Sequence, residues 1–177
     1  MHPGWPSTRS ALMPRRSLPS ILLVEDDDAH AHLIEFFLEE QPQAIRVDRV
    51  RDGEEALAYL FAHRPDEAAG FSRDASGRSL PALILLDLRL PKIDGLEVLR
   101  QIKATPDLRG IPVVILSTSE AETDAEAAYA LHANGYLVKP FDATQYAEMA
   151  EALVTYWLTW NHPPRRHPSR GVATSLS

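Results

Sequence analysis

The chain has 177 residues, enough for one domain with a sizeable core, and it carries 25 acidic side chains against 18 Lys and Arg. The formal net charge of −7 argues against a general nucleic-acid binder, and the absence of cysteine excludes disulfides, thiolate metal sites and cysteine nucleophiles. No apolar run approaches the roughly 20 residues that a membrane helix needs. Arg15 and Arg16 before an apolar segment weakly match an export signal, but the acids at 25–28 interrupt that segment, so we expect a cytoplasmic protein.

The two ends of the chain differ in composition from its middle. Residues 1–19 and 162–177 are rich in Pro, Ser and Arg without apolar periodicity, which predicts a disordered leader and a disordered tail. Residues 20–161 are predicted to form the folded domain. The tail is too short for a helix-turn-helix module, so we expect no direct control of transcription.

Strand and helix patterns alternate five times between these ends. Short apolar runs predict strands at 21–24, 45–50, 82–87, 111–116 and 135–138. Helical spacing predicts helices over 28–40 and 120–132, and others that start near 53, 94 and 142. The alternation predicts an α/β fold, a doubly wound parallel sheet with helices on both faces and right-handed crossovers. The long polar segment 63–79 is predicted to be an exposed loop.

The strand at 82–87 is the centre of the predicted sheet, because a continuous apolar run between Pro81 and Pro91 ends abruptly in Asp87. Such runs form strands that are buried on both faces of a parallel sheet. The carboxyl ends of the strands line the crevice where α/β sheets bind ligands, so Asp87 is a candidate site residue. Its alternative role is to cap a turn or the following helix, which Asp also favours.

Other predicted strands end in polar residues that would share this edge of the sheet. Glu25 and Asp26 follow the first strand, Ser117 ends the fourth and Lys139 follows the fifth. Clustered carboxylates repel one another unless a cation neutralises them, and a hard ion that prefers oxygen ligands, such as Mg²⁺, suits them best. Asp87 is then the candidate nucleophile for a phosphoryl group, with Lys139 and Ser117 stabilising the transferred oxygens. Asp26 is the expected direct metal ligand, and Glu25 is expected to act through water.

This set of residues resembles the motifs of the receiver domain of two-component response regulators. The matching residues, over about 20–160, are Glu25, Asp26, the segment 87–91, Asp94, Gly95, Ser117, Lys139, Pro140 and Phe141. The resemblance implies a five-stranded sheet in the order 2-1-3-4-5 and phosphorylation of Asp87 by a sensor histidine kinase. It also implies Mg²⁺ bound by Asp26, Asp87 and the backbone carbonyl of Arg89, and a cis peptide bond before Pro140.

The resemblance extends to residues that change state after phosphorylation. Ser117 matches the family's switch hydroxyl, and Tyr136 matches an aromatic residue whose ring turns inward as that hydroxyl moves. The alternative for Tyr136 is an ordinary, half-buried strand tyrosine. Arg89 and Ser119 stand where the family tunes the loss of the phosphoryl group, with plain surface residues as the alternative, and Thr118 stands where the family often has a smaller residue.

A narrower resemblance is to the single-domain regulators that partner bacterial phytochromes. It rests on the long segment before the third strand, the turn at 90–92, the run 117–119 and the aromatic end of the last helix. It implies a phytochrome-type histidine kinase as partner and a homodimer built on the last helix. Tyr156, Trp157 and Trp160 are the candidate interface residues, because aromatic side chains are enriched in interfaces. Trp157 continues the inner stripe of the helix, so its alternative is core packing.

The predicted function is a stand-alone signalling switch, not an enzyme acting on external substrates, whose phosphorylation alters dimerisation or partner binding. The main alternative is a Mg²⁺-dependent phosphohydrolase with an aspartyl nucleophile, but such enzymes commonly carry a second Asp where this chain has Arg89. A third interpretation is a flavodoxin-like cofactor carrier. The acids at 25–28 would repel the phosphate of such a cofactor.

Overall fold

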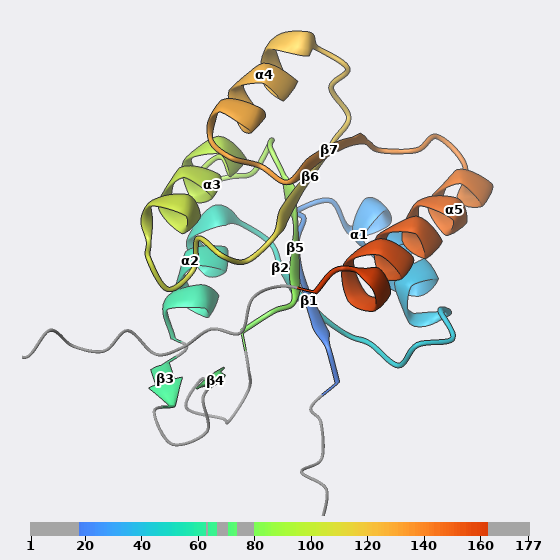
Figure 1. The fold of residues 1–177 in the computed structure, drawn as a ribbon. Coiled ribbons are helices and arrows are strands. Elements are labelled where there is room, and N and C mark those ends of the chain that lie inside the picture. Colours follow the sequence, from blue (N-terminus) through green and yellow to red (C-terminus); the bar gives the residue numbers. More distant parts are fainter. Residues whose placement is uncertain (1–17, 63, 67–70, 74–79, 163–177) are drawn as a thin grey trace, which may run out of the picture.

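The computed structural model describes residues 18–62, 64–66, 71–73 and 80–162. A five-stranded parallel sheet forms its centre, with the strand order β2-β1-β5-β6-β7 (Figure 1). The strands are β1 (Ser20–Val24), β2 (Arg46–Val50), β5 (Leu83–Asp87), β6 (Val113–Ser117) and β7 (Gly135–Val138). Counted among these five, the order is 2-1-3-4-5, which confirms the predicted topology.

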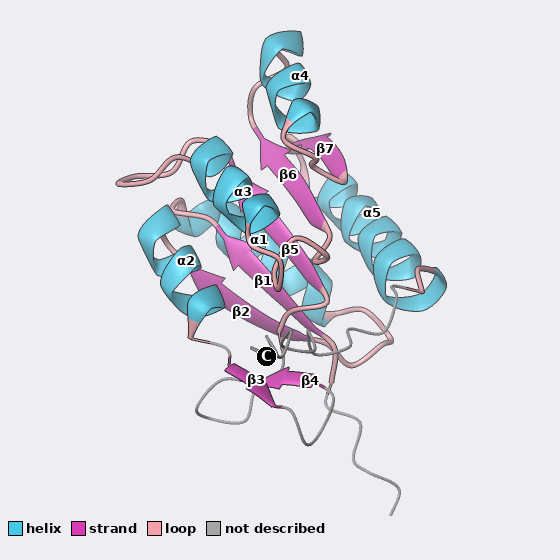
Figure 2. Cartoon of the chain, turned by 60° about the vertical axis from the view of Figure 1, so that its left-hand side comes forward, coloured by secondary structure: helices cyan, strands magenta, loops and turns pink. Residues whose placement is uncertain are grey.

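Helices cover both faces of the sheet (Figure 2). They are α1 (Asp28–Glu39), α2 (Gly53–Phe61), α3 (Gly95–Ala104), α4 (Glu122–Ala130) and α5 (Ala143–Val154). α1 and α5 pack on one face, and α2 and α3 pack on the other. Every one of these helices except α4 begins after an Asp whose carboxylate accepts a hydrogen bond from a backbone N–H of the first turn, which favours a helix start at that point. None of the helices in the described part of the chain is long and apolar enough to cross a membrane.

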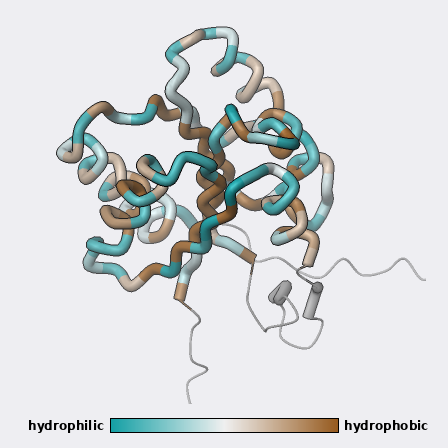
Figure 3. The backbone as a smooth tube through the Cα atoms, turned by 180° about the vertical axis from the view of Figure 1, so that it is seen from behind, coloured by the Kyte–Doolittle hydropathy of each residue, from teal (hydrophilic) through white to brown (hydrophobic). Residues whose placement is uncertain are grey.

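Two apolar layers hold the helices against the sheet. In β1, Ile21 and Leu23 face α1 and α5, while Leu22 and Val24 face α2 and α3. β1, β5 and β6 are buried along their full length, as their continuous apolar runs predict, and they form the hydrophobic centre of the molecule (Figure 3). The polar residues at the carboxyl ends of these strands therefore gather at one edge of the sheet.

The segment 63–79 differs from the predicted exposed loop. It contains two antiparallel strands, β3 (Arg64–Asp66) and β4 (Phe71–Arg73). Strands of three residues are too short to show the alternation by which a strand is recognised in a sequence. The rest of this segment lies outside the described residues, as do 1–17 of the predicted leader and 163–177 of the predicted tail.

The last helix changes type near its end. α5 continues after Val154 as a π-helix, η1 (Thr155–Trp160). Trp157 packs partly against the apolar layer under α1 and α5, whereas Tyr156 and Trp160 are exposed. The core packing considered for Trp157 is thus present in the structure.

Candidate functional site

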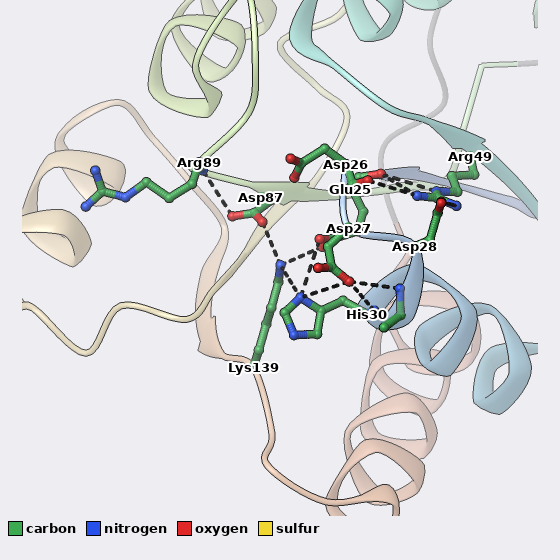
Figure 4. Close-up of polar contacts among 10 residues, drawn as sticks. Glu25, Asp26, Asp27, Asp28, His30, Arg49, Asp87, Arg89 and Lys139 are labelled. Carbon is green, nitrogen blue, oxygen red and sulfur yellow. Dashed lines mark hydrogen bonds and ion pairs between the residues drawn. The ribbon is translucent and has the colours of Figure 1, made fainter.

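A buried ion-pair cluster lies at the carboxyl ends of three strands (Figure 4). Glu25 follows β1, Asp87 ends β5 and Lys139 follows β7, and these residues are only 1%, 6% and 4% exposed. Lys139 Nζ lies 2.6 Å from Glu25 Oε2 and 2.6 Å from Asp87 Oδ2. The sheet topology therefore brings together three of the residues that the sequence places at strand ends.

Burial and neighbouring charges shift the pKa values of Glu25 and Lys139 in opposite directions. Burial raises the pKa of Glu25, and this effect outweighs the lowering by the nearby Lys139. Burial alone would lower the pKa of Lys139, but the hydrogen bond to Asp87 and the negative charges of Asp87 and Glu25 raise it above its usual range. Lys139 is therefore a firmly charged ammonium that faces two carboxylates.

Asp26 completes an acidic group that fits a divalent cation. Carboxylate oxygens of Glu25, Asp26 and Asp87 lie within 4.8 Å of one another, and Asp26 is exposed. Among the described residues, neither carboxylate oxygen of Glu25 has a donor in hydrogen-bonding geometry, although Lys139 lies within ion-pair distance. Three neighbouring carboxylates, of which Glu25 has both oxygens without a hydrogen-bond donor, match the ligands that Mg²⁺ prefers. This donor set can hold a hard divalent ion.

The turn after Asp87 fixes the orientation of its carboxylate. The backbone N–H of Arg89 donates to Asp87 Oδ1 at 3.1 Å, while the Arg89 guanidinium extends away from the cluster and contacts Asp124 of α4 at 3.0 Å (Figure 4). The N–H of Gly95 donates to the carbonyl of Leu88 at 2.9 Å. A Cβ atom at position 95 would overlap the carbonyl oxygen of Asp87, so glycine lets α3 start directly against this turn.

Ser117 and Tyr136 both form a hydrogen bond with Ser119, in the loop after β6. Ser117 is fully buried at the end of β6, and its hydroxyl accepts a hydrogen bond from the N–H of Ser119 at 3.1 Å. The hydroxyl of the half-buried Tyr136 donates to the carbonyl of Ser119 at 2.9 Å. The two predicted switch residues are therefore connected through Ser119. This contact is compatible with a switch and with an ordinary strand tyrosine.

The predicted cis peptide bond before Pro140 is wrong, because the structure has this bond in the trans form. The trans form of a bond before proline is favoured by about 0.5–1 kcal/mol. With the bond trans, the Lys139 N–H donates to the carbonyl of Ser117 at 2.8 Å and the Lys139 ammonium reaches Asp87. The cluster therefore assembles without the cis form.

Two residues of the site were missed by the sequence analysis. His30 belongs to no motif of the sequence analysis, but its Nδ1 lies 3.5 Å from Lys139 Nζ and 3.7 Å from Glu25 Oε1. Its place in the first turn of α1, directly after the acids, was the available signal. Arg49 of β2 contacts the backbone of Glu25, and no sequence motif pointed to it.

The candidate interface residues lie apart from this cluster, in η1 at the end of the last helix. Tyr156 and Trp160 are 58% and 71% exposed. The rings of Tyr156 and Trp157 pack edge to face, with centroids 4.8 Å apart. These aromatic residues are therefore available for a partner and do not contribute to the acidic site.

Comparisons with known proteins agree with this arrangement. A family model described as the response regulator receiver domain matches residues 21–151. The chain is 46% identical over 144 residues to the probable methanogenesis regulatory protein FilR2 of Methanothrix harundinacea, covering 81% of this chain and 86% of that protein. It is 41% identical over 138 residues to the response regulator Rcp1 of Synechocystis, covering 78% of this chain and 88% of that protein.

Solved structures give the same result. The phosphorylated cyanobacterial phytochrome response regulator RcpA matches with a TM-score of 0.72 and 40% identity, covering 84% of this chain and 99% of that one. The Mn²⁺-bound form of Rcp1 matches with a TM-score of 0.70 and 38% identity, covering 82% and 99%. The family model spans most of the chain, and the strand-end acids lie together in the structure. The chain therefore belongs to the response regulator receiver domain family.

Proposed function

We propose that Asp87 accepts a phosphoryl group from a phosphohistidine of a sensor histidine kinase, and that this transfer switches the protein between signalling states. The observation that carries the proposal is the position of the Asp87 carboxylate, which lies 2.6 Å from Lys139 and within 4.8 Å of Glu25 and Asp26. A nucleophile, an ammonium and a set of cation ligands are thus available at one point. Membership of the receiver family supports the same role.

In the proposed transfer, an oxygen of Asp87 attacks phosphorus, and the P–N bond to the kinase imidazole breaks as the new P–O bond forms. Lys139 donates to a transferred phosphoryl oxygen, and Ser117 at the neighbouring strand end donates to another. The Arg89 N–H keeps Asp87 oriented.

The proposed cation is Mg²⁺, held by Asp26, Asp87 and the backbone carbonyl of Arg89, with Glu25 acting through water. It would neutralise negative charge on the acids and on the phosphoryl oxygens. The buried oxygens of Glu25 and the spacing of the three carboxylates support this assignment. Rcp1, a similar protein, has been solved in a Mn²⁺-bound form.

The proposed response to phosphorylation starts at Ser117. Movement of its hydroxyl toward the phosphoryl group would break the hydrogen bond from Ser119 and release the Ser119 carbonyl from Tyr136. The Tyr136 ring would then be free to turn inward. The two hydrogen bonds at Ser119 support a path from the site to β7.

The proposed partner is a histidine kinase of the phytochrome type, and the protein is proposed to act as a switch and not as a hydrolase of external substrates. RcpA, one of the similar structures, is a phytochrome response regulator. Hydrolases of this kind commonly carry a second Asp two residues after the nucleophile, and the side chain there is Arg89, which contacts Asp124 of α4. The formal net charge of −7 gives no support for nucleic-acid binding.

The proposal is tested by incubating the full chain with acetyl phosphate and Mg²⁺, and then with phosphorylated histidine kinases of phytochrome and unrelated types. We expect one phosphoryl group per chain, lost on treatment with hydroxylamine as an acyl phosphate should be, and suppressed by EDTA. Phytochrome-type kinases are expected to transfer faster than the others. Repeated release of phosphate from external phosphomonoesters, without labelled protein, would instead support the phosphohydrolase.

The surface of η1, which continues α5, is proposed as a homodimer interface. Tyr156 and Trp160 expose large aromatic surfaces there. A groove of about 460 Å³ adjoins them, lined by residues that include Leu137, Met149, Leu153, Tyr156 and Trp157. Burying aromatic and Met side chains is typical of interface cores.

Replacing both Tyr156 and Trp160 with Glu is expected to convert the dimer to monomers, because two like charges would enter the apolar contact on each side. Sedimentation of the full chain measures the change in mass. Phe61→Glu is the matched control, since Phe61 is also an exposed aromatic residue, 53% exposed, but lies on α2. An unchanged mass for the double variant would contradict this interface.

A further inference from the structure

Arg49 lies in the edge strand β2, under the start of α1. Its Cα pairs with that of Leu23 in β1, whose side chain belongs to the apolar layer beneath α1 and α5. The Arg49 side chain is only 12% exposed, although it belongs to an edge strand and carries a charge. A buried guanidinium needs specific acceptors, because its donors have left water.

Arg49 contacts acceptors in the connection between β1 and α1 and in the first residue of α1. Nε and Nη2 donate to the carbonyl of Glu25 at 3.2 and 3.1 Å, and Nη2 also contacts the carbonyl of Asp26 at 3.4 Å. Nη1 lies 2.7 Å from Asp28 Oδ1. The hydrogen bond from Arg49 is the main reason that the pKa of Asp28 lies below its usual range. One side chain therefore contacts three of the four acidic residues that join β1 to α1.

These contacts fill a gap in the backbone hydrogen bonding of the site. The carbonyls of Glu25 and Asp26 follow the last residue of β1 and precede the Asp27 cap of α1. Within the described part of the chain, no backbone N–H is recorded as donating to either carbonyl. Arg49 supplies the donors instead and draws both carbonyls toward β2.

The carboxylates of the same two residues point the other way. Figure 4 shows Arg49 and Asp28 on one side of the connection and Asp87 and Lys139 on the other. The carboxylate oxygens of Glu25 and Asp26 lie within 4.8 Å of Asp87. With the carbonyls held on one side, rotation of the two peptide units is restricted, and the acids stay directed at Asp87.

We propose that Arg49 is a positioning residue that holds Glu25 and Asp26 in the arrangement required for divalent-cation binding. It sets the affinity for the cation and takes no part in the chemistry at Asp87. The inference rests on the proposed function, in which Mg²⁺ binds beside Asp26 and Asp87. Arg51 provides a contrast, because it is 60% exposed and, among the described residues, its side chain contacts this part of the chain through the Asp28 carboxylate and not through the carbonyls of Glu25 and Asp26.

The test is a calorimetric titration of the full chain with Mg²⁺, without any phosphodonor, for Arg49→Met and Arg51→Met. Loss of residues that orient metal ligands typically weakens binding by 10- to 100-fold, so we expect the Arg49 variant to bind Mg²⁺ about tenfold more weakly. The Arg51 variant and Asp28→Asn should stay within about twofold of the unmodified protein, because both leave the carbonyl contacts in place. Labelling of Asp87 at saturating Mg²⁺ should recover to near the unmodified rate in every variant.

Equal Mg²⁺ affinities of the Arg49 and Arg51 variants would overturn the inference while leaving the proposed function intact. Failure of the unmodified protein to bind Mg²⁺ would overturn both. Thermal unfolding in EDTA checks that the variants are folded. If Arg49→Met does not fold, Arg49→Lys and Arg51→Lys are compared, and only the first is expected to bind Mg²⁺ more weakly.

Discussion

Asp87→Asn is expected to abolish labelling of the chain by acetyl phosphate, with a loss of at least about a thousandfold in rate. The carboxamide is nearly the same size, so it can keep the hydrogen bond from the Arg89 N–H, but it is a far weaker nucleophile. It also removes one of the three carboxylates that lie within 4.8 Å of one another. Incorporated phosphate is measured by mass spectrometry of the intact chain and of the peptide that contains residue 87.

Asp94→Asn is the matched control for this experiment. Asp94 lies in the same connection between β5 and α3, but its carboxylate accepts from the N–H of Glu97 and caps α3. Asn caps helices about as well as Asp, so labelling should be unchanged. Labelling of the Asp87 variant at the normal stoichiometry would show that another group is the acceptor.

Lys139→Met is expected to have the second large effect, on both stability and labelling. The substitution leaves Glu25 and Asp87 buried without the ammonium that lies 2.6 Å from each. Removing one partner of a buried charge cluster costs about 3–5 kcal/mol of unfolding free energy. Labelling should fall by about a hundredfold, because a charged donor to the phosphoryl oxygens is lost. Denaturant unfolding in EDTA and the rate of labelling measure the two effects.

The pH dependence of the Lys139 variant gives an independent check. Burial raises the pKa of Glu25 above its ordinary value of 4.5, and removing Lys139 takes away the main opposing effect. Folded protein therefore binds a proton at a pH where unfolded protein does not, so the variant gains stability as pH falls from neutral toward 4.5. In EDTA, the difference in unfolding free energy between the variant and the unmodified protein should become smaller as the pH falls over that range.

Lys92→Met is the control for the loss of a lysine charge. Lys92 is 55% exposed and pairs with Asp52 at 2.7 Å, away from the cluster. The Asp52 side chain is only 7% exposed, but it also accepts from the N–H of Glu55, so we expect loss of the exposed ammonium to cost on the order of 1 kcal/mol, less than loss of Lys139. If the two lysine variants lost similar amounts of stability and activity, the special role of Lys139 would be contradicted.

The amino-acid sequence by itself determined the sheet and most of the acidic cluster. Apolar runs such as 83–86 are long enough to specify a buried strand, and Asp87 marks where the strand ends. Parallel strands present the same end at one edge of the sheet, so Glu25, Asp87 and Lys139 could be placed together before any contact was known. The Asp residues that cap four of the helices were equally local signals.

The tertiary structure alone decided the features that depend on register and side-chain reach. Arg49 contacts Glu25 because β2 pairs with β1 in the register that sets Arg49 beside Leu23. His30 reaches Lys139 across 109 residues of chain. The trans bond before Pro140 corrects the family-based expectation. Strand ends are encoded by a few adjacent residues, whereas these contacts arise only once separate segments have packed together, so no local pattern records them.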